Sequence, residues 1–297
     1  MRHAYIINAF NNFKVLEKLL LLLDDPRNTI YLHIDKKVNK FNESDFAPLV
    51  NRATLVFVPR SVVNWAGYSH IAIALHLLKC ALKADFDYCH LLSCADFPIK
   101  TQDEIDAFFT KNAGKEFIDF APENYAFAKY KCHYYHFFVD NRYYRHNMLL
   151  KILNHGVARA QRFLRLRRAQ PEIKHGSTWF SITRDLAQYV VQNEEKIRKG
   201  FRFTLSADEC FLQTLVYHSP FLARVNQFEQ KYVGNARFID WTRRAGNSPY
   251  TFRLDDFEDL MSRGEGLCFA RKFDEILDFP VVEKIFDRLS HTAFAPR

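Results

Sequence analysis

The sequence predicts an α/β fold in which strands and helices alternate along the first third of the chain. Short apolar segments rich in β-branched and aromatic residues, such as those at 3–9 and 53–59, are separated by segments with helical spacing. This alternation is typical of parallel βαβ units. The chain has 297 residues, of which 48% are hydrophobic, and this is enough for one large core or two smaller ones.

The expected elements of the first half follow one another without a long gap. They are a strand at 3–9, a helix at 13–25 that ends before Pro26, strands at 28–37 and 53–59, a helix at 69–84, a strand at 87–100 that enters a turn at Pro98, and a helix at 101–112. Ser69 is expected to cap its helix, and Thr101 and Glu104 have the spacing of a capping box. Ligands of open parallel sheets bind at the carboxyl ends of the strands, which predicts a nucleotide cleft at His33–Asp35 and Ser93–Asp96.

The second half of the chain is less regular. A segment at 129–147 mixes aromatic and basic residues, and a helix is expected at 154–170. A strand followed by a helix is expected at 176–193, and a short late strand at 236–241.

The totals limit the class of protein. The formal net charge of +8 favours anionic partners without choosing among them. The six cysteines form no CxxC pair and several lie in apolar segments, which is typical of buried thiols in a reducing compartment. No apolar run reaches the length of a membrane span and no targeting segment is evident, so a cytoplasmic location is expected.

The segment "LSADECFLQTL" at 205–215 places two adjacent carboxylates, Asp208 and Glu209, before a run of apolar residues. Acids are favoured in the first turn of a helix by the helix dipole, so these two residues are candidate helix caps. The alternative is that one of them is a general base whose pKa is raised by an apolar setting. Position alone suits both interpretations.

Other candidate ligands are weaker. His33 and Asp35 have no further partner at metal-ligand spacing, so no metal site is predicted. The "DFD" at 85–87 precedes a strand instead of following one, which does not favour a metal–nucleotide role. Arg253, Arg271 and Lys272 lie near one another in the sequence, either as ordinary surface charges or as cations that neutralise a departing diphosphate.

Five arginines lie between 159 and 168 with apolar residues among them: Arg159, Arg162, Arg165, Arg167 and Arg168. They are expected on a helix, which is either a solvated surface or an attachment to an anionic membrane surface. Binding to nucleic acid is not predicted, because the sequence contains no recognisable nucleic-acid-binding motif.

Several segments, in order, resemble one family. The chain is similar to the core-2/I-branching β-1,6-N-acetylglucosaminyltransferases of glycosyltransferase family 14, which also contains the peptide O-xylosyltransferases, and it looks like a bacterial-type member. The similar segments are "AYIINAFNNFKVLEKLL", "IYLHIDKK", "SVVNWAGYSHIAIALHLLKCAL", "HLLSCADFPIK", "YYHFF", "GSTWFSITRD", "SADECFLQTL" and "FARKFD". Together they span roughly residues 3–275.

The resemblance implies a GT-A-like nucleotide-sugar transferase fold with a mixed central sheet flanked by helices. It implies one catalytic domain over 1–297, with a nucleotide-sugar-binding half at 1–115 and an acceptor-binding and catalytic half at 116–297. It also implies an enzyme that inverts the anomeric centre and needs no metal or other cofactor.

The resemblance also assigns roles to particular residues. Glu209 matches the family's catalytic base, and Arg253 and Lys272 match the two cations that hold the donor diphosphate. Asp35 matches the nucleotide-contacting aspartate, and Trp241 matches a tryptophan that lines the acceptor sugar.

Neighbouring positions in the similar segments are expected at the same sites. We expect Trp65, Ser69 and Asp96 in the nucleotide site. Lys131 and Tyr135 are expected on the acceptor side, where the resemblance is weakest.

Three positions depart from the family's pattern, and all are expected near the donor cleft. Phe10 stands where many members have histidine, and Ala66 and Cys94 stand where members have glycine. The donor sugar is therefore less firmly predicted than the type of reaction.

These observations predict an inverting, metal-independent glycosyltransferase. The expected donor is UDP-GlcNAc, and the expected acceptor is a hydroxyl of a bacterial surface glycan, which a lipid-linked form would present at the inner face of the cell membrane. UDP-xylose, UDP-glucose or UDP-galactose are alternative donors. A basic, non-catalytic module that binds polyanions is the alternative from another class.

Overall fold

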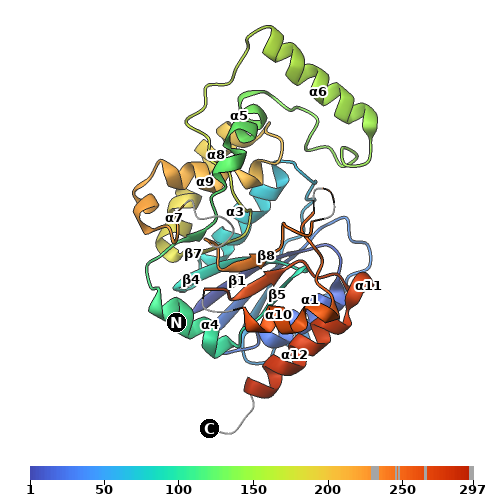
Figure 1. The fold of residues 1–297 in the computed structure, drawn as a ribbon, viewed down its shortest axis with the longest axis vertical. Helices are drawn as coiled ribbons and strands as arrows, with labels where there is room; N and C mark the ends of the chain where they lie inside the picture. Colours follow the sequence, from blue (N-terminus) through green and yellow to red (C-terminus); the bar gives the residue numbers. More distant parts are fainter. Residues whose placement is uncertain (229–233, 245, 247, 264–265, 294–297) are drawn as a thin grey trace.

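A mixed, six-stranded sheet forms the centre of the protein, with helices on both faces (Figure 1). The computed structural model describes residues 1–228, 234–244, 246, 248–263 and 266–293. Across the sheet the strands are β3 (Thr54–Val58), β2 (Asn28–Ile34), β1 (His3–Ala9), β4 (Tyr88–Ser93), β7 (Phe180–Thr183) and β6 (Phe117–Ile118). The first four strands are parallel, and β7 and β6 each run antiparallel to their inner neighbour.

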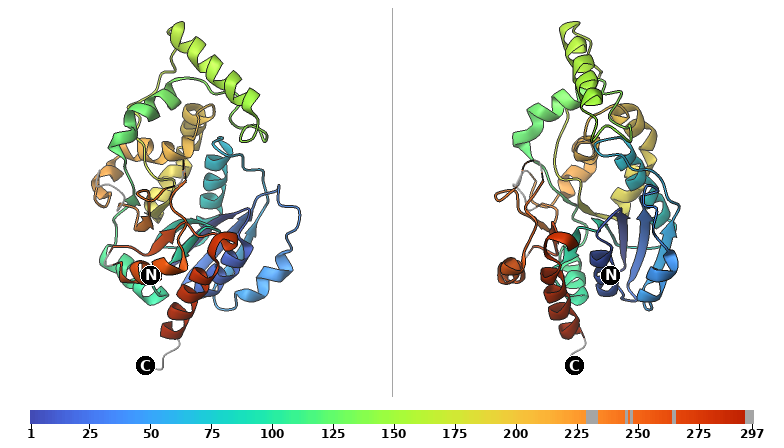
Figure 2. Two further views of the ribbon diagram at one scale, coloured as in Figure 1. Left: turned by 45° about the vertical axis from the view of Figure 1, so that its right-hand side comes forward. Right: turned by 90° about the vertical axis from the view of Figure 1, so that its right-hand side faces the viewer.

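The alternation of side chains along β1 divides the core into two layers. Ala4 and Ile6 face one layer, whereas Tyr5 and Ile7 face the other. The first layer is covered by α3 (Ser69–Ala81), α5 (Tyr125–His133), α7 (Arg184–Gln192), α8 (Glu194–Phe201) and α9 (Phe211–Tyr217). The second is covered by α1 (Phe13–Leu22), α2 (Glu43–Phe46), α4 (Gln102–Lys111), α10 (Phe257–Ser262) and α12 (Pro280–Ala293). Figure 2 shows α1 and α12 packed together on that face.

A second, three-stranded sheet lies beside the main one and carries the last part of the chain. Its strands are β5 (Asp96–Pro98), β9 (Phe269–Arg271) and β8 (Arg237–Ile239), in that order. Because β5 follows β4 almost directly, this small sheet brings residues 269–273 next to the carboxyl end of β4. The short helix α11 (Glu275–Asp278) follows β9.

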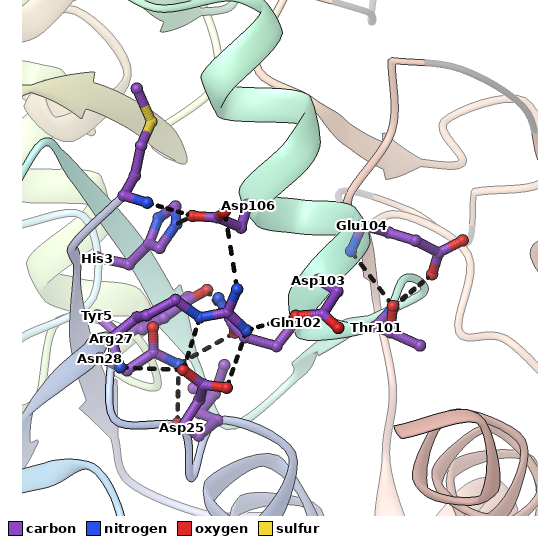
Figure 3. Close-up of polar contacts among 12 residues, drawn as sticks. His3, Tyr5, Asp25, Arg27, Asn28, Thr101, Gln102, Asp103, Glu104 and Asp106 are labelled. Atoms are coloured by element: carbon purple, nitrogen blue, oxygen red, sulfur yellow. Dashed lines mark hydrogen bonds and ion pairs between the residues drawn. The ribbon is translucent and has the colours of Figure 1, made fainter. Parts of the chain in front are cut away.

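At the amino edge of the main sheet, a polar network fastens α4 to β1 and β2 (Figure 3). Arg27 bonds Asp25 and Asp103 and lies 3.7 Å from Asp106, which in turn lies 3.3 Å from His3. The predicted capping box is confirmed, since Thr101 accepts from the Glu104 amide and the Glu104 carboxylate accepts from the Thr101 amide. This edge is held by charges that neutralise one another.

Most of the predicted elements are confirmed, with small differences at their ends. The expectation that Ser69 caps α3 is wrong, because Tyr68 occupies the cap position. The hydroxyl of Ser69 instead donates to Asp140 Oδ1 at 2.6 Å. The main sheet takes strands from both sides of residue 115, and the division into two functional halves stays a prediction.

The helix expected at 154–170 is displaced along the chain. The observed helix α6 spans Met148–Phe163 and lies at the end of the molecule farthest from the sheet (Figure 1). Only Arg159 and Arg162 of the five arginines are helical. Arg168 is buried and donates to Thr204 Oγ1 at 2.9 Å, so it supports the structure between α5 and α8 and is not a surface charge.

Candidate active site

The carboxyl edge of the main sheet gathers the predicted nucleotide residues. Asp35 directly follows β2 and is 3% exposed, and its amide donates to the carbonyl of Ala9 at the end of β1. Its carboxylate accepts from the Lys37 amide at 2.8 Å. Arg60 fixes the same turn by donating to the carbonyl of Asp35. Asp35 therefore lies at the carboxyl edge of the main sheet, and its role in a nucleotide cleft stays a prediction.

His33 has a structural environment. Nδ1 lies 2.9 Å from Asn8 Oδ1, and Nε2 accepts from the Ser61 amide at 2.9 Å. Burial lowers the pKa of His33 to about 4, so the ring is neutral near neutral pH. Within the described ranges, no three His, Cys, Asp or Glu side chains are placed to hold a metal ion.

Asp96, the second predicted acid of this edge, anchors a cation. It is fully buried, and its Oδ2 accepts from the Ser93 amide and hydroxyl and from Arg271 Nη1 at 2.9 Å. The guanidinium of Arg271 also lies 4.3 Å from the ring centroid of Trp179. A buried carboxylate needs such partners because an unpaired charge in the interior is very costly.

Lys272 is the predicted diphosphate ligand whose ammonium forms no ion pair within the described residues. Its neighbours fix its backbone, since the Phe273 amide donates to the Ala95 carbonyl and the Phe252 amide donates to the Lys272 carbonyl. Burial lowers the pKa of the Lys272 ammonium, and the charges of Arg271 and Arg145 lower it further. In the part of the chain that the structure describes, no carboxylate pairs with this ammonium. Such an excess of positive charge favours a bound anion.

The backbone hydrogen bond between Phe252 and Lys272 brings the next residue, Arg253, into the neighbourhood of Lys272. Its guanidinium, however, donates to the carbonyl of Leu277 at the end of α11, at 2.8 Å. In this arrangement it stabilises the end of that helix. Its role at the diphosphate stays a prediction.

Glu209 lies directly before the segment that begins α9, where two cationic or hydrogen-bonding side chains meet it. Lys131 Nζ donates to Glu209 Oε2 at 2.9 Å, and His175 Nε2 lies 3.3 Å from the same oxygen. The Glu209 side chain keeps 38% of its accessible surface, whereas those of Lys131 and His175 keep 7% and 11%. Both contacts use Oε2, so among the described residues Oε1 has no hydrogen-bond partner.

The local backbone explains how Glu209 reaches this position. A single 3-10 turn, η3 (Ala207–Glu209), precedes α9, and the Glu209 carbonyl accepts from the Gly176 amide at 2.9 Å. A Cβ on Gly176 would lie 1.8 Å from the carbonyl oxygen of Asp119. Only a glycine at position 176 therefore allows the backbone next to His175 to lie so close to the end of β6.

The pKa expected for Glu209 is corrected by the structure. Burial raises the pKa of this carboxyl, but the hydrogen bond from His175 and the charge of Lys131 outweigh it and hold the pKa at about 2. Burial lowers the pKa of Lys131, but the Glu209 carboxylate raises it more. The group is an ionised carboxylate at rest and not a carboxyl with a raised pKa.

The helix-capping interpretation of the two acids is wrong. Cys210 occupies the cap position of α9, with no side-chain hydrogen bond, and the first turn of α9 contains no acid. Asp208 accepts instead from Thr178 Oγ1 at 3.0 Å. Since Trp179 is the next residue and stacks on Arg271, a continuous chain of contacts joins the acids to the cations of β9.

The family of this chain is decided by its sequence profile. The profile described as "Branch: Core-2/I-Branching enzyme" matches residues 3–262. The chain belongs to the Core-2/I-Branching enzyme family. The ordered resemblance found in the sequence is thereby confirmed, and the mixed sheet flanked by helices agrees with the expected GT-A-like fold.

Curated relatives of this family member are named xylosyltransferases. "Xylosyltransferase sqv-6" of Caenorhabditis briggsae is 27% identical over 302 residues, which cover 92% of this chain and 34% of the relative. "Xylosyltransferase 2" of Mus musculus is 25% identical over 303 residues, which cover 95% of this chain and 33% of the relative. The chain thus spans about a third of the length of these relatives. The solved structure of mouse xyloside xylosyltransferase 1 covers 91% of this chain and 97% of its own, with a TM-score of 0.38 and 10% identity.

One departure from the family pattern has a visible backbone consequence. Ala66, where the sequence resemblance predicts a glycine in the family, has a φ of 63°, a conformation that glycine adopts far more readily. Its carbonyl accepts from the Ser206 amide at 2.9 Å, so this loop is tied to the segment that carries Glu209. The next residue, Gly67, has no room for a side chain, because a Cβ would lie 2.2 Å from Asp140 Oδ1.

Three further predicted residues have few contacts with the groups described above, and their roles stay predictions. Trp65 is 47% exposed and lies in the loop that precedes α3. Trp241 follows β8, whose Ile239 is in register with Arg271. Tyr135 is placed differently: it stacks on Phe137 with ring centroids 5.4 Å apart and bonds α6 through its backbone. None of its recorded contacts is with Glu209.

Sequence reasoning missed His175, Trp179 and Arg145 as members of the site. His175 and Trp179 flank the "GST" of a segment that was recognised only as similar to the family. Arg145 lies in the aromatic and basic segment where the resemblance is weakest. Its nearness to Lys272 follows from tertiary structure, and no local pattern in the sequence indicated it.

Proposed function

We propose that this chain is an inverting, metal-independent glycosyltransferase that moves a sugar from a UDP-sugar to a hydroxyl of a glycan. The observation that carries this proposal is the contact chain from Glu209 through Asp208, Thr178 and Trp179 to Arg271. It joins an ionised, partly exposed carboxylate to Lys272, a half-buried cation that forms no ion pair within the described residues and has Arg271, Arg145 and Asp274 as charged neighbours. A base and an anion site on one surface are what transfer from a nucleotide diphosphate requires.

In the proposed mechanism, Glu209 removes the proton of the acceptor hydroxyl. The oxygen then attacks the anomeric carbon from the face opposite the diphosphate, and the bond between that carbon and the diphosphate oxygen breaks. A carboxylate with a pKa of about 2 is a weak base, so proton transfer late in the reaction suits it. An acceptor that displaces Lys131 from Oε2 would make Glu209 more basic.

Lys272 stabilises the negative charge that develops on the departing diphosphate. A fixed cation in a partly buried site is effective because it does not have to reorganise during the reaction. Arg145 and Arg271 add positive charge around it. Arg253 is the second predicted ligand, and it would have to leave the carbonyl of Leu277 to reach the diphosphate.

The donor that we propose first is UDP-GlcNAc. UDP-xylose is the second candidate, and a specific observation favours it: the curated relatives that this chain matches are named xylosyltransferases. The acceptor that we propose is a bacterial surface glycan, in a lipid-linked form, used at the cytoplasmic face of the cell membrane. No helix within the described ranges is both long enough and apolar enough to span a membrane.

The test is the release of UDP from UDP-GlcNAc, UDP-xylose, UDP-glucose and UDP-galactose, with EDTA present and without acceptor. We expect slow hydrolysis of one donor by the wild-type protein and a loss of roughly 10²–10⁴-fold in Glu209→Gln, the range of general-base contributions. The variant keeps the shape of the side chain, so its melting temperature serves as the control for folding.

Each part of the proposal has its own contrary result. Equal rates for the wild type and Glu209→Gln would reject Glu209 as the base. Activity that requires added Mn²⁺ would reject the metal-independent mechanism. If no donor is hydrolysed, the melting temperature is measured at increasing UDP concentration. A rise in melting temperature would support a nucleotide site that needs an acceptor for activity. No rise would favour the alternative of a non-catalytic module that binds polyanions.

A further inference from the structure

Helix α6 is attached to the protein through a face that carries both polar and apolar side chains, on which Asn154 and Ala158 are fully buried. Asn154 is fully buried, and its Nδ2 donates to His136 Nδ1 at 2.9 Å and lies 3.3 Å from Tyr144 Oη. Gln161 bonds both backbone groups of Tyr135, accepting from its amide and donating to its carbonyl. These contacts fix which face of α6 is turned toward the protein.

The opposite face of α6 is apolar and points away from the protein. Residues 149, 152, 153, 156, 160 and 163 share one side of a helix, and all are apolar or glycine. The exposed fractions are 62% for Leu149, 59% for Ile152, 44% for Leu153, 68% for the neighbouring Met148 and 87% for Phe163. A surface helix of a globular protein normally turns its largest apolar side chains toward the core, whereas α6 turns only Leu150, Val157 and Ala158 inward and leaves its larger apolar stripe exposed.

Strong positive charge surrounds this apolar face. Residues 141–171 contain no Asp or Glu. They contain eight cations: Arg142, Arg145, Lys151, Arg159, Arg162, Arg165, Arg167 and Arg168. All but Arg168 and Lys151 are exposed. Leu164 and Leu166, at 62% and 57% exposed, extend the apolar surface among these charges beyond the end of the helix.

We propose that α6 lies in the surface of an anionic lipid bilayer, with its apolar face at the boundary between headgroups and acyl chains. Leu149, Ile152 and Phe163 would enter the bilayer, and Arg159 and Arg162 would bind lipid phosphates. A helix of 16 residues is about 24 Å long, and this one has charges along it, so it suits the plane of the membrane and not a span across it.

The charge around the apolar face distinguishes an anionic bilayer from a second copy of the chain and from nucleic acid as the partner of α6. A second copy placed on the same face would bring two sets of cations together without a single acidic side chain from 141–171 to offset them. Nucleic acid would match the charge but would leave the apolar face in water. An anionic bilayer matches both the charge and the apolar surface.

The location of α6 gives membrane binding a consequence for the site. His136, which bonds Asn154, follows α5, and α5 carries the Lys131 that contacts Glu209. A membrane-bound α6 would therefore hold the Glu209 region close to lipid-linked acceptors. This consequence rests on the proposed function, whereas the binding of α6 to lipid does not.

The experiment is co-sedimentation of the full chain with phosphatidylcholine vesicles and with vesicles that contain an equal share of phosphatidylglycerol. We expect binding to the anionic vesicles only. The double variant Leu149→Ser/Ile152→Ser should bind at least about tenfold more weakly, because two apolar side chains no longer enter the bilayer. Arg159→Gln and Arg162→Gln should each cost about fivefold, which corresponds to ~1 kcal/mol per basic residue. Ile276→Ser is the matched control, since this isoleucine is 89% exposed on α11.

Several outcomes would overturn the proposal. These are equal binding to both vesicle types, a loss for Ile276→Ser as large as that for the α6 variant, or a change from dimer to monomer caused by Leu149→Ser/Ile152→Ser without lipid. UDP release in the absence of vesicles should be the same in the wild type and the α6 variant. Vesicle binding with neither UDP release nor stabilisation by UDP would therefore reject the glycosyltransferase proposal alone, and UDP release without vesicle binding would reject the membrane proposal alone.

Discussion

The two edges of the main sheet use charge in opposite ways. At the amino edge, Arg27 lies among Asp25, Asp103 and Asp106, and every one of these carboxylates has a cation beside it (Figure 3). At the carboxyl edge, Lys272 has only other cations as close charged neighbours apart from Asp274. The first arrangement neutralises itself. The second keeps an excess of positive charge, because Arg271 and Arg145 outnumber Asp274 around Lys272.

The pKa directions of the two cations differ in the same way. Hydrogen bonds with Asp25 and Asp103 raise the pKa of Arg27, so its charge is favoured by folding. Burial and neighbouring cations lower the pKa of Lys272, so its charge is disfavoured by folding. A cation that the folded protein disfavours is what the proposed diphosphate site requires.

The largest expected effect comes from removing this cation. Lys272→Met keeps the length of the side chain and should lower the rate of UDP release by roughly 10²–10³-fold, the usual cost of losing one preorganised charge at a departing group. Its melting temperature should stay the same or rise, because the lost charge was unfavourable in the folded state. Both quantities are measured on the same preparation.

The matched change at the other edge is Arg27→Met. It should lower the melting temperature by breaking the contacts with three carboxylates, and it should leave the rate of UDP release unchanged. Partly exposed ion pairs contribute little each, so we expect a loss of a few degrees. If Arg27→Met slowed the reaction as much as Lys272→Met, the distinction between the two edges would be lost.

The next effect concerns the pH dependence of the reaction. The pKa of Glu209 is about 2, below its ordinary value, so the base is ionised at any pH where the protein can be assayed. Lys131→Met removes one of the groups that lower this pKa, and the pKa should rise. The rate should then fall as the pH drops through the new value, an acid limb that the wild type lacks.

The control for this experiment is Lys129→Met, an exposed position on the same helix. Its pH profile should match that of the wild type. The same shift also affects stability: because the folded-state pKa of Glu209 is depressed, its stabilising contribution is present above about pH 4.3 and is lost as the pH falls toward 2. A Lys131→Met profile without an acid limb would mean that Lys131 does not control the ionisation of Glu209.

The regular first third of the fold could be predicted from the sequence because its patterns are local. The strand at 3–9 and the capping box at Thr101 and Glu104 each depend on residues close together in the chain. The end of a helix in a polar segment is less well determined, and the helix predicted at 154–170 begins six residues earlier, at Met148. Its orientation depends on Asn154 and Gln161 bonding to other segments, which no periodicity reveals.

The candidate site was predictable only as far as family-like motifs extend. Glu209 and Lys272 lie in such motifs. His175 and Arg145 affect the same site through contacts made in three dimensions, and the depressed pKa of Glu209 depends on His175. The sequence alone suggested an apolar setting and therefore the opposite direction of the shift.

The smallest expected effect concerns the loop that precedes α3 and is hydrogen-bonded to the segment that carries Glu209. Ala66 has a φ of 63°, and a left-handed conformation costs a non-glycine residue about 1–2 kcal/mol. Ala66→Gly removes that cost but gives the unfolded chain more freedom, so the net gain in the free energy of unfolding should be about 0.5–1 kcal/mol, measured by denaturant unfolding. Ala81→Gly, in the last turn of α3, is the matched control and should destabilise, because glycine is unfavourable within a helix. A loss of stability in Ala66→Gly would mean that the buried methyl group of Ala66 contributes more to packing than its backbone conformation costs.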